Sequence, residues 1–293
     1  MVDGGGSMAR RKSSRDQSAT MTEHAFGRSL PNNASFHQPF TISHQLFMWI
    51  TAPLAGKSCD VYEPAHSPAG VVLFLHGYDN VTLKENAAFT AALERHRLAC
   101  VCPQGPGCWW TETVFPAFDP AVSPIAWLRG PLREAIAVKW PEAGQWIAIT
   151  GVEMGGQGAL QLAYRAARQF PVVAAISPKV DFESWHGHGT TLDELFPDRE
   201  AARQQTATLH LHPLNWPRQQ LLLCDPADHY CIDGVLILAS KLFSTGIPFE
   251  QDFTTSHGGY GWNYANAMAD RVIDFLAAGL QAERARLKSR EEG

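Results

Sequence analysis

The sequence lacks long apolar segments. None of its uninterrupted hydrophobic runs reaches the roughly 18 residues that a membrane-spanning helix needs. The first 22 residues also contain no apolar core of the kind found in secretory signal peptides. We therefore expect a cytoplasmic protein with no membrane partner.

An excess of positive charge is also missing. The chain has 24 lysines and arginines against 29 aspartates and glutamates, which gives a formal net charge of −5. Proteins that bind nucleic acid or anionic membranes usually present a basic field, and this composition supplies none. The basic cluster of Arg10, Arg11, Lys12 and Arg15 lies in a leader rich in serine and glycine, and we interpret it as a solvated tail. We expect no nucleic-acid partner.

Motifs for metals and phosphates are absent too. The six cysteines include no CxxC pair, so we interpret them as reduced thiols. The segments 186–188 and 210–212 are H-x-H pairs, but neither has a further ligand at an established zinc spacing. The glycine-rich stretch 155–158 lacks the G-K-[ST] ending of a phosphate loop. The sequence therefore predicts no metal and no cofactor.

The chain is long enough for one large core, because 45% of its 293 residues are hydrophobic. We expect a flexible leader at residues 1–34, one α/β domain at 35–280, and a charged tail at 281–293 that frays. Residues 177–217 show no regular pattern, and we interpret them as a cap-like excursion over a pocket. The sequence leaves the oligomeric state open.

Strand-like and helix-like segments alternate through this domain. The continuous apolar run at 71–75 is typical of a central strand buried on both faces. Such alternation predicts a mostly parallel central sheet with helices on both faces. The expected strands are 46–51, 57–62, 71–75, 99–102, 145–150, 172–176, 220–224 and 249–254, and the expected helices are 85–98, 125–140, 154–169, 232–245 and 262–280.

The stretch 147–160 joins a short apolar strand, a glycine-punctuated turn and an Ala/Leu-rich helix. This is the layout of a nucleophile elbow, in which a sharp turn lifts one side chain above the sheet. Gly151, Gly155 and Gly156 stand where a side chain would collide with neighbouring backbone. The elbow pattern is G-x-S-x-G, and the serine position holds Glu153.

Three motifs in this order resemble those of α/β-hydrolases, most closely the esterase D and S-formylglutathione hydrolase-like group of esterases. Residues 75–78 resemble the oxyanion turn of that group, 151–160 resemble its G-x-S-M-G-G-x-G-A-L elbow, and 258–262 resemble its G-G-H-x-W histidine loop. The resemblance covers roughly residues 45 to 280. It implies the α/β-hydrolase fold and a Ser-His-Asp triad that acts on esters.

The sequence keeps the triad positions only in part. Asp228 follows the strand at 220–224 and stands where the family places the carboxylate that orients its histidine. Asp225 and Asp233 are competing candidates, and capping of the next helix is the alternative role for Asp228. The best-aligned histidine position holds Tyr260, and His257 is the alternative base in the same loop.

Glu153 changes the chemistry that the elbow can perform. Glutamate cannot form the alkoxide with which a serine attacks an ester. Its side chain has nearly the shape of a formylated serine, so we expect its carboxylate to enter the oxyanion hole formed by the backbone N–H groups of Tyr78 and Met154. A carboxylate held in this way would be a poor base and would occupy the position of a substrate carbonyl.

Two functions remain open. In the first, the protein is an esterase-like pseudoenzyme whose pocket binds a small acyl or ester-like ligand or a protein partner. In the second, it is a hydrolase that uses Glu153 as nucleophile or as water-activating base, assisted by Asp228 and His257. Tryptophans in the loops around the expected pocket either form a ligand wall or only pack: Trp109, Trp110, Trp185 and Trp216.

Overall fold

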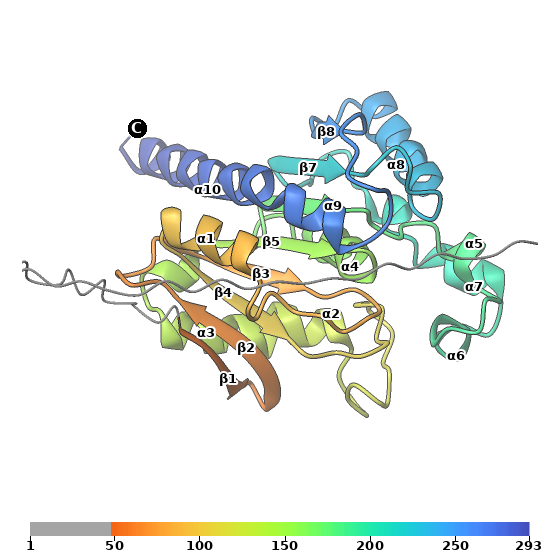
Figure 1. The fold of residues 1–293 in the computed structure, drawn as a ribbon, viewed down its shortest axis with the longest axis horizontal. Coiled ribbons are helices and arrows are strands. Elements are labelled where there is room, and N and C mark those ends of the chain that lie inside the picture. The colour runs from red at the N-terminus through yellow and green to blue at the C-terminus, as the bar shows by residue number, and fades with distance from the viewer. Residues whose placement is uncertain (1–47, 293) are drawn as a thin grey trace, which may run out of the picture. The chain divides into compact units, whose positions relative to one another are not determined.

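The computed structural model describes residues 48–292, and within them the strands form one eight-stranded sheet (Figure 1). The order across the sheet is β1-β2-β4-β3-β5-β6-β7-β8, antiparallel from β1 through β4 and parallel from β4 onward. The strands are β1 (Met48–Leu54), β2 (Lys57–Glu63), β3 (Gly70–Leu75), β4 (Leu98–Pro103), β5 (Ile147–Val152), β6 (Val172–Ile176), β7 (Gln219–Leu223) and β8 (Glu250–Asp252).

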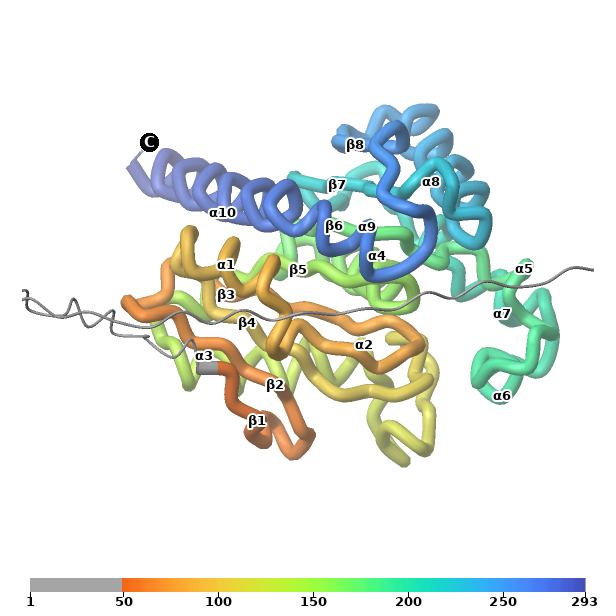
Figure 2. The backbone as a smooth tube through the Cα atoms, viewed as in Figure 1, coloured from red at the N-terminus to blue at the C-terminus, as the bar shows by residue number. Residues whose placement is uncertain are grey.

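Helices cover both faces of this sheet, as the unbroken apolar strands predict. Alternate residues of β3 enter two separate cores: Leu73 faces one, and Phe74 faces the other. One face carries α1 (Ala87–Arg95), α9 (Trp262–Ala267) and α10 (Ala269–Glu291) (Figure 2). The other carries α2 (Pro124–Trp127), α3 (Arg133–Lys139), α4 (Met154–Arg165) and α8 (Ile232–Ser244). The expected fold class is thus confirmed.

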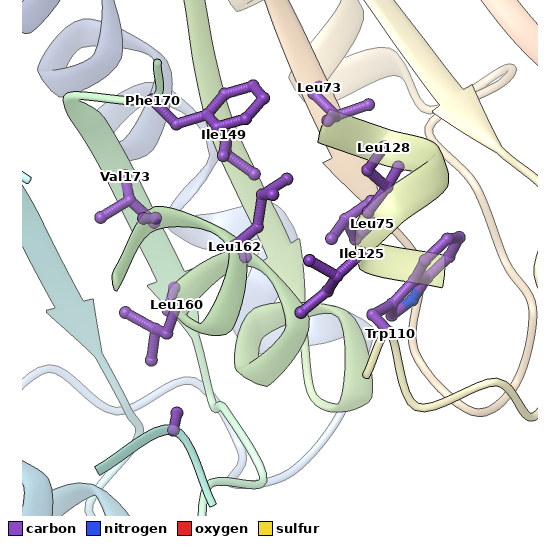
Figure 3. Packing of buried hydrophobic residues seen from close by; sticks show 14 of the residues in the cluster. Leu73, Leu75, Trp110, Ile125, Leu128, Ile149, Leu160, Leu162, Phe170 and Val173 are labelled. Atoms are coloured by element: carbon purple, nitrogen blue, oxygen red, sulfur yellow. The ribbon is translucent and has the colours of Figure 1, made fainter. Parts of the chain in front are cut away.

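Helix α4 is the central element of the second face. Its side chains Leu160 and Leu162 lie against the sheet beside Ile149 of β5 and Val173 of β6, and Ile125 of α2 lies nearby (Figure 3). Burying side chains of this size contributes about 1.5–3 kcal/mol each. This packing fixes the end of β5 and the start of α4, which together form the elbow.

The segment expected as one helix at 125–140 contains a wider turn. Between α2 and α3 the backbone forms the π-helical turn η1 (Leu128–Leu132), which contains Pro131. Proline has no N–H to donate within a helix, and the π turn accommodates it without ending the helical path. The described residues also contain two short 3-10 turns, η2 (Ala143–Gln145) and η3 (Ala207–His210).

The excursion at 177–217 is more regular than the sequence indicated. It contains the short helices α5 (Phe182–Trp185), α6 (Leu192–Leu195) and α7 (Arg199–Gln204), which lie beyond the carboxyl ends of the strands (Figure 1). Asp181 and Asp198 cap two of them, so local side-chain bonds support helices too short for a periodic pattern.

The charged tail at 281–293 was expected to fray, and this expectation was wrong up to Glu291, where α10 ends. Glu283 is buried and pairs with Arg286 one turn later. Arg284 donates to the carbonyl of Ala69 and stacks over the ring of Trp146 at 4.8 Å. These contacts hold a polar helix end against the domain. The leader at 1–34 and the start of the domain at 35–47 lie outside the described residues.

All six cysteines are unpaired and buried. Cys100 and Cys102 share one face of β4, as their spacing predicts, and their sulfur atoms lie 3.7 Å apart. Burial raises the pKa of the Cys59, Cys108 and Cys224 thiols to about 12. Within residues 48–292, none of the helices combines the length and the apolar character that crossing a membrane requires.

Candidate active site

Glu153 lies at the sharp turn between β5 and α4. Its backbone has φ 54° and ψ −113°, a conformation that costs free energy for any residue other than glycine. The turn is held by the main-chain N–H of Glu153, which donates to the carbonyl of Ile176 over 3.0 Å. Gly155 is required because a Cβ there would lie 1.9 Å from the carbonyl oxygen of Leu75. This is the strand-turn-helix geometry that the glycine pattern predicted.

Glu153 is 7% exposed as a residue, and its carboxylate points back across the turn. Its Oε2 accepts a hydrogen bond from the main-chain N–H of Tyr78 over 2.8 Å. A Cβ on Gly77 would lie 2.6 Å from the same oxygen, so a larger residue there would displace the carboxylate. Of the two expected oxyanion donors, Tyr78 therefore contacts the carboxylate, whereas the N–H of Met154 forms no hydrogen bond to it within the described chain.

His76 holds the turn that carries Tyr78. It is fully buried, and burial lowers the pKa of its imidazole, so the ring is neutral. Its Nε2 accepts from the N–H of Gly105 over 3.0 Å, which leaves Nδ1 to donate to the carbonyl of Gly77 over 2.7 Å. His76 is thus a positioning residue for the Tyr78 amide.

The partner of the other carboxylate oxygen is Lys179, which the sequence analysis did not single out. The Lys179 ammonium pairs with Oε1 of Glu153, and Lys179 is 8% exposed. The main-chain N–H of Lys179 also donates to the Glu153 carbonyl over 3.1 Å. Its position in the sequence could have indicated this role. Lys179 follows the end of β6, and the carboxyl ends of neighbouring parallel strands meet at one edge of a sheet.

Aromatic rings surround the Lys179 ammonium. Its Nζ lies 3.9 Å from the centroid of the Trp185 ring and 5.3 Å from that of Tyr260. Tyr230 extends this group, with its ring centroid 5.2 Å from that of Tyr260. Cations are attracted to the faces of such rings, and the attraction grows where water is excluded. The ion pair of Glu153 and Lys179 is therefore supported by both charge and ring contacts.

Tyr260 and His257 take different places. Tyr260 lines the same small cavity as Glu153. Burial raises the pKa of the Tyr260 hydroxyl, and its hydrogen bond to Glu153 and the negative charge of that residue raise it further. The side chain of His257 is exposed, and it does not line this cavity. Of the two loop residues, Tyr260 is the one that meets the carboxylate.

Two cavities flank the ion pair. The one on the Glu153 side encloses about 50 Å³ and is also lined by Asp79, Ser177 and Trp262. The other encloses about 260 Å³ and is lined by Lys179 and Trp185. The smaller cavity thus borders Glu153, and the larger one borders Lys179 next to the excursion.

The two aspartates after β7 have different partners. Asp228 is fully buried, but its Oδ1 accepts from the main-chain N–H groups of Tyr230 and Cys231 at 3.0 and 3.1 Å. These contacts brace the turn before α8, whose N-cap residue is Cys231 and which has no side-chain cap. Within residues 48–292 Asp228 forms no hydrogen bond to a histidine ring. The carboxylate that reaches the loop of His257 is that of Asp225, through the main chain.

The remaining candidates have structural contacts. Trp109 and Trp110 are fully buried, and Trp110 fills the space beside Gly158, so packing is the correct reading for this pair. His186 is bound to the carbonyl of Phe196, while His210 contacts Arg165. In the part of the chain that the structure describes, no group of three or more His, Cys, Asp or Glu side chains is arranged around a common metal position.

Comparison with known proteins identifies the fold. No protein-family sequence model matches the chain, and no curated protein matches it significantly in sequence. Among solved structures, it is similar to an S-formylglutathione hydrolase from Agrobacterium tumefaciens, with a TM-score of 0.65 at 17% identity, over 80% of this chain and 94% of that one.

Two further solved structures are similar to this chain. A ferulic acid esterase has a TM-score of 0.65 at 15% identity, over 80% of this chain and 98% of its own. The S-formylglutathione hydrolase FrmB from Staphylococcus aureus has a TM-score of 0.61 at 15% identity, over 78% of this chain and 98% of its own. The sheet order, the strand-turn-helix unit at Glu153 and these likenesses together establish that the protein has the α/β-hydrolase fold, in a form similar to S-formylglutathione hydrolases and esterases.

Proposed function

We propose that the protein is an esterase-like pseudoenzyme, in which Glu153 replaces the nucleophilic serine, and that it binds a small acyl or ester-like ligand without turning it over. The observation that carries this proposal is the position of the Glu153 carboxylate. It accepts the N–H of Tyr78 and pairs with Lys179, so both of its oxygens are engaged. An ester carbonyl would need that same N–H to stabilise the charge that develops on its oxygen.

The alternative, a hydrolase that uses Glu153 as nucleophile or base, has less support. A carboxylate that attacks an ester carbonyl forms an anhydride, and a second base must then activate water. His257, the expected base, does not line the cavity of Glu153. The ion pair with Lys179 and the hydrogen bond from Tyr78 occupy both carboxylate oxygens, so neither is free to attack a substrate.

The cavity on the Lys179 side is the proposed ligand site. Its volume of about 260 Å³ is close to the lower limit of roughly 300 Å³ for small-molecule pockets. Trp185 and Tyr230 supply apolar surface, and Lys179 supplies N–H donors for a carbonyl oxygen. A ligand there would lie behind the ion pair, away from the Tyr78 amide, and would remain uncleaved.

The decisive experiment measures p-nitrophenyl acetate hydrolysis by the purified protein and its labelling by a fluorophosphonate probe. We expect neither above the level of a Glu153→Gln control. Turnover above about 1 per second, an ordinary enzyme rate, that disappears in Glu153→Gln would refute the pseudoenzyme and favour the alternative.

Ligand binding is tested separately with phenyl acetate, followed by saturation-transfer NMR. We expect signal transfer that is lost when Trp185→Ala opens the wall of the larger cavity. Tyr78→Ala is the matched control, because it keeps the main-chain N–H and removes a side chain that does not line that cavity. Equal transfer to the wild type and to Trp185→Ala would refute this ligand site.

A further inference from the structure

A second site with uncompensated charge lies at the carboxyl end of α4. Arg129, Arg165 and Arg168 line one hollow of about 330 Å³, and Asn215 also borders it. None of these four residues lines the two cavities beside Glu153 and Lys179. In a protein with a net charge of −5, three guanidinium groups around one hollow are a local exception.

Few carboxylates of the described residues lie close enough to neutralise these three arginines. Across residues 48–292, no carboxylate lies within ion-pair distance of Arg165 or Arg168, and Arg129 reaches Glu112 only at 4.0 Å. Burial lowers the pKa of the Arg165 guanidinium, Glu112 partly offsets this, and the positive charge of Arg129 lowers it further. The guanidinium stays charged, because arginine is not deprotonated in proteins. The repulsion between the two groups would be relieved by a bound anion.

Neutral groups hold the Arg165 side chain in place. Its Nε donates to Oε1 of Gln161 over 3.1 Å, and its Nη2 donates to Oε1 of Gln205 over 3.0 Å. Nη2 also lies 2.7 Å from Nε2 of His210. Burial and the charge of Arg165 lower the pKa of His210 to about 4, so this imidazole is neutral and accepts the bond. The guanidinium is thus fixed before any ligand arrives, and a ligand need not order it.

The backbone around Arg129 gives a second indication. Arg129 belongs to the π-helical turn η1, and π-helical turns recur at functional sites. The turn directs Arg129 into the same hollow as the arginines at the end of α4. Two elements far apart in the sequence therefore bring guanidinium groups to one place.

We propose that this arginine hollow binds a phosphate dianion, either free or as a phosphate monoester. Arg129 and Arg168 can each offer two parallel N–H donors to phosphate oxygens, a geometry that a lysine ammonium lacks. Arg165, whose Nε and Nη2 are already bound, adds its charge and the N–H groups of Nη1. The volume exceeds that of a phosphate group and leaves space for the alcohol part of a monoester. The carbonyl end of α4 opposes an anion, so we expect an affinity in the millimolar range, about 1 mM.

The test is an NMR titration of the full chain with sodium phosphate at about pH 8, where inorganic phosphate is mostly a dianion. Sodium chloride of equal ionic strength is the reference. We expect saturable shifts at Arg165, Arg168 and Asn215, and at the ring of His210 that contacts Arg165. Phosphate shifts no larger than those in chloride would overturn the proposal.

The variants make the result specific. Arg165→Gln with Arg168→Gln should weaken phosphate binding at least about tenfold, because each removes a charge-assisted contact. Arg203→Gln is the matched control, because Arg203 is an exposed arginine paired with Glu200 elsewhere and should change nothing. Should the double variant fail to fold, Arg168→Gln alone, at an exposed position, should still weaken binding. Unchanged affinity in folded variants would refute the site.

The source of the phosphate group follows from a parallel titration with phenyl phosphate. Tighter binding of phenyl phosphate than of inorganic phosphate would assign the hollow to a phosphate monoester. Equal affinities would assign it to the free ion.

Discussion

The carboxylate of Asp225 accepts a hydrogen bond from the main-chain N–H of His257 over 2.6 Å. The same carboxylate accepts from the N–H groups of Gly259 and Ala227 and from the hydroxyl of Ser256. Burial acts to raise the pKa of Asp225, but these hydrogen bonds outweigh it and leave the pKa below its ordinary value of 3.8. An ionised aspartate therefore fastens the loop that carries Tyr260 to the end of β7.

This bond network predicts a pH-dependent effect of Asp225→Asn. A carboxyl group with a lowered pKa in the folded state stabilises the protein above its unfolded pKa, and this contribution is lost as the pH falls through the folded pKa. At neutral pH we expect the variant to lose about 2–3 kcal/mol of unfolding free energy, since hydrogen bonds to a buried charge are broken. Urea unfolding at neutral pH and near pH 3 measures the difference in unfolding free energy between the wild type and the variant. This difference should become smaller in acid. An equal loss at both pH values would contradict the assignment.

The buried pair of Glu153 and Lys179 predicts strong coupling between the two residues. Lys179→Met leaves the carboxylate buried without its partner and should destabilise the protein by about 3–5 kcal/mol. The double variant Glu153→Gln with Lys179→Met removes both charges and should recover most of that loss. Urea unfolding of the wild type, both single variants and the double variant gives the coupling energy. Additive effects would show that the two residues do not interact.

The elbow predicts a steric effect at one glycine. Gly155→Ala would place a Cβ 1.9 Å from the carbonyl oxygen of Leu75, which β3 cannot move without losing its pairing. We expect a loss of more than about 4 kcal/mol or no soluble protein. Gly130→Ala is the control, because a Cβ at that helical position meets nothing within 4 Å. A folded Gly155→Ala variant as stable as the control would mean that the turn is wider than described.

The altered residues also predict how catalysis can be restored. Glu153→Ser with Tyr260→His would place a serine at the elbow and an imidazole in the loop. The Oδ2 atom of Asp228 accepts only a 3.9 Å contact from Cys224, so this oxygen is available to orient the new imidazole. We expect measurable p-nitrophenyl acetate hydrolysis in this double variant, because backbone oxyanion donors provide much of acyl-transfer catalysis. Neither single variant should be active, because an unassisted serine is a weak nucleophile. Activity in Glu153→Ser alone would show that His257 reaches the site.

The fold could be predicted from the sequence because its signals are local. The apolar run of β3 and the glycines of the elbow each carry a steric or burial requirement that can be read within about ten residues. The expected strand at 172–176 matches β6 in both bounds. Helix ends are harder to predict from local sequence: α4 ends at Arg165, four residues before the expected end, because the helix pattern does not encode the tertiary contacts that stop it.

The site was predictable only in part, because its main contacts join distant residues. Glu153 and Tyr78 follow from motifs, whereas the pairing of Glu153 with Lys179 depends on how the loop after β6 folds back over the sheet. The sequence favours Asp228 over Asp225, because Asp225 lies directly at the end of the expected strand. The choice between them is made by which carboxylate the loop of His257 packs against, and spacing does not encode that.

The six buried thiols can report local unfolding of the protein without any engineered label. A thiol reacts with a disulfide reagent only as an exposed thiolate, and burial together with the raised pKa of Cys59, Cys108 and Cys224 suppresses both conditions in the folded state. Each cysteine should therefore label only when its surroundings open. Because the thiols lie in β2, in β4, in the loop after it and around the end of β7, the order in which they label reports which part of the sheet separates first.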